Sequence, residues 1–145
     1  MTRSLFANWA VWAVLSAAFA ALTAIFAKVG VAGVDSDFAT LIRTVVILAL
    51  VAAIAFAGGA VQPLSSIATR TWVFLVLSGL ATGASWLCYF RALKMGDAAR
   101  VAPVDKLSVV LVAVFGVIFL GERLSAMAAL GVGLIAAGAA LVALG

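Results

Sequence analysis

Five apolar stretches of membrane-spanning length fill this chain of 145 residues. A helix that crosses the hydrocarbon core of a bilayer needs about 20 residues, at a rise of about 1.5 Å each. The stretches supply that length at residues 9–29, 38–57, 72–93, 101–120 and 126–144, with only short connectors between them. We therefore expect an all-α integral membrane bundle of five transmembrane helices that forms a single domain over residues 1–145.

The composition supports the same fold class and narrows the chemistry. Hydrophobic residues make up 68% of the chain and charged residues only 10%, against about 25% charged residues in soluble domains. The net charge of +4 is modest and spread along the chain, so we expect no nucleic acid partner. There is no His, and the single Cys88 lies inside an apolar stretch, which argues against disulfide frameworks, His-based metal sites and His-dependent catalytic triads. We expect no metal, no cofactor and no enzyme activity.

The first stretch has a signal peptide as its rival interpretation. Arg3 precedes an apolar run that contains the small-residue motif Ala18-Phe19-Ala20. That run continues well beyond the 7 to 15 residues that are usual for the apolar region of a signal peptide. We expect the first helix to be retained.

The basic residues give no firm membrane orientation. Arg3, Arg70 and Arg123 belong to one end of the bundle, and Lys94 and Arg100 lie in the connector at the other end. Four more basic residues lie within or at the edges of helices near that second end: Lys28, Arg43, Arg91 and Lys106. The positive-inside rule is therefore undecided. Two alternatives stay open: insertion in both orientations with an antiparallel dimer that rebuilds the inverted repeats of larger transporters, or one orientation with the N-terminus inside.

The third stretch carries the clearest polar pattern. Ser78, Thr82, Ser85 and Tyr89 are spaced by four, three and four residues, which puts them on one narrow helical face. Because hydrocarbon offers polar groups no partner, this face is expected to point toward the bundle interior. It either hydrogen-bonds to neighbouring helices or lines a path for a solute.

Three other helices offer partly polar faces, and the last one does not. Ser16 and Thr23 lie on the first helix, Arg43 on the second and Asp105 on the fourth. Beyond its first residues, the stretch 126–144 consists of small and apolar side chains that permit close backbone approach. We interpret that helix as a packing or dimerisation element.

Charges inside the membrane point most sharply to function, because each costs several kcal/mol unless it is paired, hydrated or near the interface. Arg43 lies five residues beyond Phe38, about 7 to 8 Å into its helix. Asp105 follows Pro103, which predicts a first helical turn where the helix dipole favours an acid. Either residue has a functional role, or the two form a structural Arg43–Asp105 ion pair.

Basic residues outnumber acidic ones near one end of the predicted bundle, at the connectors that join helices one to two and three to four. A mouth with a modest positive surplus attracts anions or the carboxylate of a zwitterion. The basic residues are Lys28, Arg43, Arg91, Lys94, Arg100 and Lys106, and the acidic ones are Asp35, Asp37, Asp97 and Asp105.

Three segments resemble an EamA-type domain of the drug/metabolite transporter superfamily. They are Tyr89-Phe90-Arg91-Ala92-Leu93, the run Ala99-Arg100-Val101-Ala102-Pro103-Val104, and Phe119-Leu120-Gly121-Glu122-Arg123-Leu124. The resemblance covers essentially the whole chain as a single five-helix repeat. It implies one half of a ten-helix transporter, in which two inverted repeats move amino acids, nucleotide-derived metabolites or similar small molecules.

Two further residues bear on the resemblance. Glu122 matches the Gly-Glu motif of the family, where it is expected to cap a helix or pair with Arg123. The small multidrug exporters of the superfamily use a membrane-embedded Glu on the first helix, and this first helix has none. Proton-coupled export of lipophilic cations is therefore not expected, and Asp105 is the sole candidate proton carrier.

We expect a secondary transporter of small polar metabolites, amino-acid-like or anionic, that acts by alternating access across the cell inner membrane as a multi-pass homodimer, with the lipid bilayer and a small-molecule substrate as its other partners. A passive channel or a non-transporting subunit of a larger complex, such as a flippase partner, is the alternative. A membrane enzyme is the weakest reading, since no nucleophile–base pair is evident. The residues expected to line the path are Ser16, Thr23, Arg43, Ser78, Thr82, Ser85, Tyr89 and Asp105.

Overall fold

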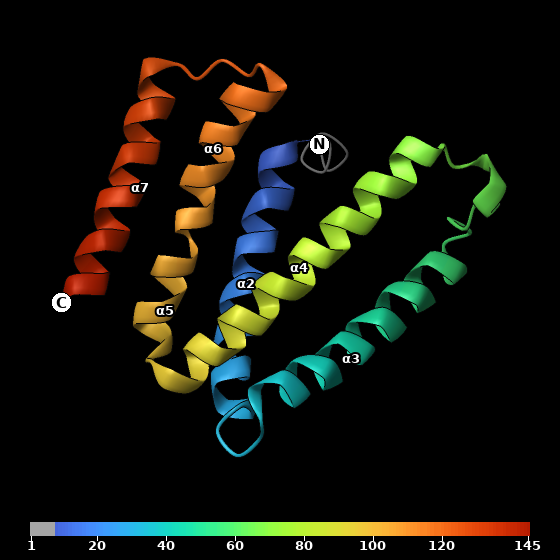
Figure 1. Cartoon of the computed structure of the whole chain (residues 1–145), viewed down its shortest axis with the longest axis horizontal. Coiled ribbons are helices and arrows are strands. Elements are labelled where there is room, and N and C mark those ends of the chain that lie inside the picture. The colour runs from blue at the N-terminus through green and yellow to red at the C-terminus, as the bar shows by residue number, and fades with distance from the viewer. Residues whose placement is uncertain (1–7) are drawn as a thin grey trace, which may run out of the picture. The chain divides into compact units, whose positions relative to one another are not determined.

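A computed structural model describes residues 8–145 of the chain, and within that range it consists of helices and connectors without a β-strand. Five helical segments are long and apolar enough to cross a membrane, which confirms the predicted all-α fold class. Figure 1 shows their order along the chain. The elements are α2 (Trp9–Gly30), α3 (Ser36–Ala57), the short 3₁₀ helix η1 (Leu64–Ser66), α4 (Thr69–Met95), α5 (Ala98–Asp105), α6 (Leu107–Leu120) and α7 (Ala126–Leu144).

The helices group into two compact units. One unit is Val29–Lys94 and contains α3, η1 and most of α4. The other combines the chain up to Lys28 with Met95–Gly145, and so contains most of α2 together with α5, α6 and α7. The single domain over residues 1–145 stays a prediction.

Asp35 fixes the start of α3. Its carboxylate Oδ1 accepts hydrogen bonds from the backbone N–H groups of Asp37 at 2.9 Å and Phe38 at 3.2 Å. These groups have no partner inside the helix, so the cap supplies one. The helix therefore begins at Ser36, two residues earlier than the apolar run predicts, and includes Asp37 in its first turn.

The fourth membrane span is interrupted, which corrects the prediction for Asp105. α5 begins at Ala98, so Pro103 lies inside that helix instead of in its first turn. A proline there cannot donate to the carbonyl of Ala99, and its ring crowds that carbonyl, which weakens the helix. α5 ends at Asp105, and Lys106 separates it from α6. The prediction that Asp105 lies in the first turn of the span is therefore wrong, because Asp105 ends α5 and directly precedes Lys106, the N-cap of α6.

The C-terminal end of α6 is built around Gly116. The backbone N–H groups of Gly121 and Glu122 both donate to the carbonyl of Gly116, and Gly121 has the left-handed φ of 67° that favours glycine. The side chain of Glu122 folds back over Gly116, where a Cβ atom would lie 2.6 Å from Oε2. The Gly-Glu motif thus caps α6 through its backbone, and in the described part of the chain Glu122 forms no ion pair with Arg123.

α7 packs along α5 and α6, as its small residues predict (Figure 1). Ser125 caps its start by accepting a hydrogen bond from the N–H of Ala128 at 3.1 Å. At its other end, Arg100 donates from Nη2 to the carbonyl of Ala143 at 3.1 Å. A cation at this position complements the negative end of the α7 dipole.

We predict that Gly116→Ala destabilises the protein relative to Gly131→Ala, because the new methyl group displaces the Glu122 carboxylate. A Cβ at Gly131 meets no atom within 4 Å, so that variant isolates the gain in helix propensity of up to about 1 kcal/mol. Thermal unfolding in detergent measures the difference. In a Glu122→Ala background the two glycine variants should behave alike, and a difference that persists there would contradict the explanation.

Candidate functional site

Arg43 is the charged residue that lies deepest along a spanning helix in the unit Val29–Lys94. It is the eighth residue of α3, about 10 Å along the axis from Ser36, and its side chain is half-buried. The guanidinium carbon lies 4.1 Å from the centre of the Trp86 ring and 5.4 Å from the centre of the Phe90 ring. Cation–π contacts of this kind contribute about 0.5 to 2 kcal/mol each. Two rings of α4 therefore hold the guanidinium of α3.

The ring pair was not among the residues predicted from the sequence. Trp86 and Phe90 are one helical turn apart, so they share a face of α4, and Phe90 is only 3% exposed. A signal for them was present: Trp86 lies in the second half of its span, whereas the other tryptophans lie near helix starts. A mid-span indole at that position is suited to accept a cation.

The predicted polar stripe of α4 divides into two parts. Tyr89 is half-buried and lies near Arg43. Ser78, Thr82 and Ser85 are exposed. The hydroxyl of Thr82 donates to the carbonyl of Ser78 at 2.9 Å, which satisfies its proton within the helix but leaves its oxygen able to accept. The structure thus places Tyr89 near Arg43 and leaves three hydroxyl residues on an open face.

The remaining predicted residues belong to the other unit. Ser16 is exposed and Thr23 is half-buried, both on α2. Asp105 is half-buried, and its Oδ2 lies 3.5 Å from Nζ of Lys106. The Arg43–Asp105 ion pair stays a prediction, as does the lining of one path by all eight residues.

Arg91 has a carboxylate partner. Its Nε and Nη2 atoms donate to Oδ1 and Oδ2 of Asp37 at 3.0 and 2.6 Å, a bidentate pair that joins the end of α4 to the start of α3. Both side chains are about half exposed to the surroundings, at 59% for Arg91 and 47% for Asp37. The pair is neutral as a whole, so the positive surplus predicted for the mouth comes from the other basic residues.

Three other basic residues near the connectors donate to backbone carbonyls. Lys94 donates to Val34 at 2.8 Å, and in the other unit Lys28 donates to Gly96 at 2.8 Å. Arg100 is already engaged at the end of α7. These charges therefore hold connectors and helix ends in place. Attraction of an anion by the mouth as a whole stays a prediction, and Arg43 differs from these residues in that aromatic rings, not oxygen atoms, hold it.

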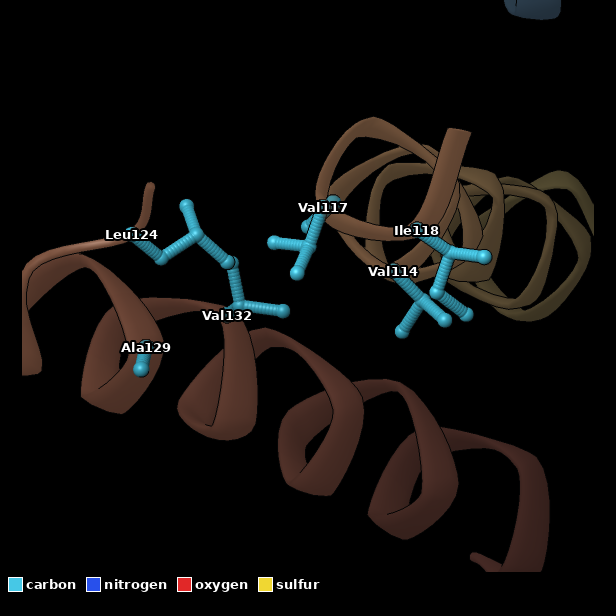
Figure 2. Close-up of a pocket in the computed structure, with 7 residues that line it drawn as sticks. Val114, Val117, Ile118, Leu124, Ala129 and Val132 are labelled. Carbon is cyan, nitrogen blue, oxygen red and sulfur yellow. The ribbon is translucent and has the colours of Figure 1, made fainter. Parts of the chain in front are cut away.

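A groove of about 270 Å³ lies between α6 and α7 (Figure 2). Every side chain that lines it is aliphatic, and Figure 2 shows Val117 and Val132 projecting into it from the two sides. Such a lining offers a polar solute no hydrogen bond. The lining residues are Ala113, Val114, Val117, Ile118, Leu124, Ala129 and Val132.

Residues 8–145 contain no group of three or more His, Cys, Asp or Glu side chains that could hold a metal ion. The polar groups of the unit Val29–Lys94 include an aromatic-bound guanidinium, a phenol and a row of hydroxyl groups. These groups can bind and orient a small polar molecule.

Comparison with known proteins identifies the family of the chain. The model of the EamA-like transporter family matches residues 7–144. A protein of Sinorhizobium sp, named as an uncharacterized transporter in the cobO 3'region, is 71% identical over 118 residues, which cover 81% of this chain and 84% of that protein. No solved structure matches the chain. With five helices suited to cross a membrane and a family match over nearly its whole length, the chain belongs to the EamA-like transporter family.

Proposed function

We propose that this protein is a secondary transporter of small polar metabolites, amino-acid-like or anionic, across the cell inner membrane. The observation that carries the proposal is the open hydroxyl face of α4, formed by Ser78, Thr82 and Ser85. In a spanning helix, hydroxyl groups that face lipid have no partner beyond their own backbone. A face of this kind is explained if it borders a water-filled path.

The same face supports assembly as a homodimer. The described residues contain five spans, as one repeat of the resembled superfamily does, and transporters of that superfamily pair two such repeats in inverted orientation. A second copy would cover the exposed face of α4 and enclose the path between two repeats. The undecided distribution of basic residues favours an antiparallel pair, which reproduces an inverted repeat.

Transport would then proceed by alternating access. Two repeats that rock against each other open a site near the membrane midplane first to one side and then to the other. The path in each repeat is lined by the eight predicted residues, and the nearness of Tyr89 to Arg43 supports the inclusion of these two. A passive channel or a flippase partner subunit is the competing function, since either uses a polar face in the same way.

We predict saturable counterflow by purified protein in liposomes that are preloaded with unlabelled amino acids and carboxylic acids. Ser85→Leu should lower the initial rate at least tenfold, because an apolar side chain removes a hydroxyl from the path and narrows it. Leu80→Phe is the matched control, since it adds bulk on a nearly opposite side of α4 and should leave the rate unchanged. Flux that never saturates would identify a channel, and absence of flux for every solute would favour the partner-subunit alternative.

We predict that two oppositely oriented copies are required. Gln62→Lys with Ser65→Lys adds charge to the connector between α3 and α4, and Ala32→Lys with Gly33→Lys adds it to the connector between α2 and α3. Each pair should hold the protein in one orientation and abolish transport when expressed alone, because the positive-inside rule then applies. Co-expression of the two variants should restore counterflow. Full activity of either variant alone would rule out the antiparallel dimer.

A further inference from the structure

The acidic residues of the unit Val29–Lys94 are already engaged. This segment contains two carboxylates, Asp35 and Asp37. Asp35 accepts two backbone N–H groups at the start of α3, and Asp37 uses both oxygens to bind Arg91. Neither carboxylate is available to neutralise Arg43.

Arg43 is held in a way that leaves its hydrogen-bonding edge open. Cation–π contacts use the face of the guanidinium, whereas its five N–H donors point outward in its plane. Within residues 29–94 no oxygen atom accepts a hydrogen bond from Arg43. The ring platform thus fixes the cation without satisfying its donors.

The depth of Arg43 makes this arrangement costly without a counter-charge. Arg43 lies about 10 Å along the axis of α3 from Ser36, the first residue of that helix. Because its side chain is held over Trp86, the guanidinium does not extend along the helix toward the headgroup region. The backbone carbonyls around it belong to helices and already accept hydrogen bonds there. A positive group so placed requires either an anion or water.

We infer that Arg43, stacked on Trp86 and Phe90, is a binding site for the carboxylate of a small molecule, with Tyr89 as a neighbouring polar group. The planar fork of a guanidinium matches a carboxylate in a bidentate geometry. The site rests on the proposed function, because it assigns the transported solutes to the class of carboxylic and amino acids.

A single carboxylate suits this site better than a phosphate. Arg43 supplies one positive charge. Two other basic residues of the unit, Arg91 and Lys94, lie near the C-terminal end of α4, and each has a partner of its own. A phosphate monoester carries about −1.5 to −2 charges at neutral pH and would remain partly uncompensated. A carboxylate carries one negative charge, which Arg43 balances.

The test uses Trp86 as its reporter. A variant with Trp9→Phe, Trp12→Phe and Trp72→Phe keeps Trp86 as its one indole, and it is placed in phosphatidylcholine nanodiscs. Lactate and alanine should change the emission of Trp86 saturably, whereas lactamide, which lacks the carboxylate, should not. Inorganic phosphate should bind at least tenfold more weakly than lactate.

Three arginine variants locate the response. Arg43→Gln should abolish it, and Arg43→Lys should weaken the apparent affinity at least tenfold, because an ammonium keeps the charge but loses the fork. Arg70→Gln is the matched control, since Arg70 also lies over a ring, 5.9 Å from that of Phe74, at the start of α4. It should leave the titration unchanged, and thermal unfolding of each variant verifies that it is folded.

Several outcomes would overturn the site. The first is an emission change with lactamide as large as that with lactate, and the second is an unchanged response in Arg43→Gln. The third is an emission change in phosphatidylglycerol nanodiscs that abolishes the response to lactate, which would identify a lipid headgroup as the ligand. A response that emerges only after Asp105→Asn would identify Asp105 as the counter-charge. If Arg43→Gln still transports uncharged solutes, the carboxylate site is rejected but the transporter function is kept. If lactate binding depends on Arg43 but no solute shows counterflow, the site is kept and the transporter function is rejected.

Discussion

The scarcity of hydrogen-bond partners in hydrocarbon shapes the whole protein. Each polar group on a spanning helix must be satisfied by its own helix, by a neighbour, by water or by a ligand. Thr40, Thr44 and Thr82 return their hydroxyl protons to carbonyls one turn earlier, at 2.7 to 2.9 Å. Lys28 and Lys94 reach connector carbonyls, and Arg91 reaches a carboxylate. Arg43 is not satisfied in these ways, and the proposed carboxylate site rests on that difference.

This constraint separates residues that hold the fold from residues that serve the site. From the sequence alone, the charged residues near the connectors were interpreted as the mouth of a solute path. In the structure, most of those charges close helix ends, so their contribution to stability explains their presence. Arg43 stands apart because aromatic rings support it and leave its donors available.

Much of the fold followed from the sequence, because apolar length alone defines a spanning helix. Five spans and their connectors were predicted with small differences at the ends, where caps such as Asp35 extend a helix beyond its apolar run. The interruption at Lys106 was missed, since the run around Pro103 was taken to begin a helix that in fact begins at Ala98. For the candidate site, the depth of Arg43 in its helix was evident from the sequence. Its ring partners depend on how α3 and α4 pack, which a periodic pattern does not reveal.

The fold of Glu122 over Gly116 has a consequence for how this sequence can diverge. The space above residue 116 is filled by a side chain from six positions later, so position 116 cannot gain a side chain without moving that acid. Relatives that replace the glycine with a bulkier residue should also have lost the acid, and those that keep the acid should keep the glycine. Natural variation at these two places is therefore expected to be correlated, as a record of one packing arrangement inherited as a unit.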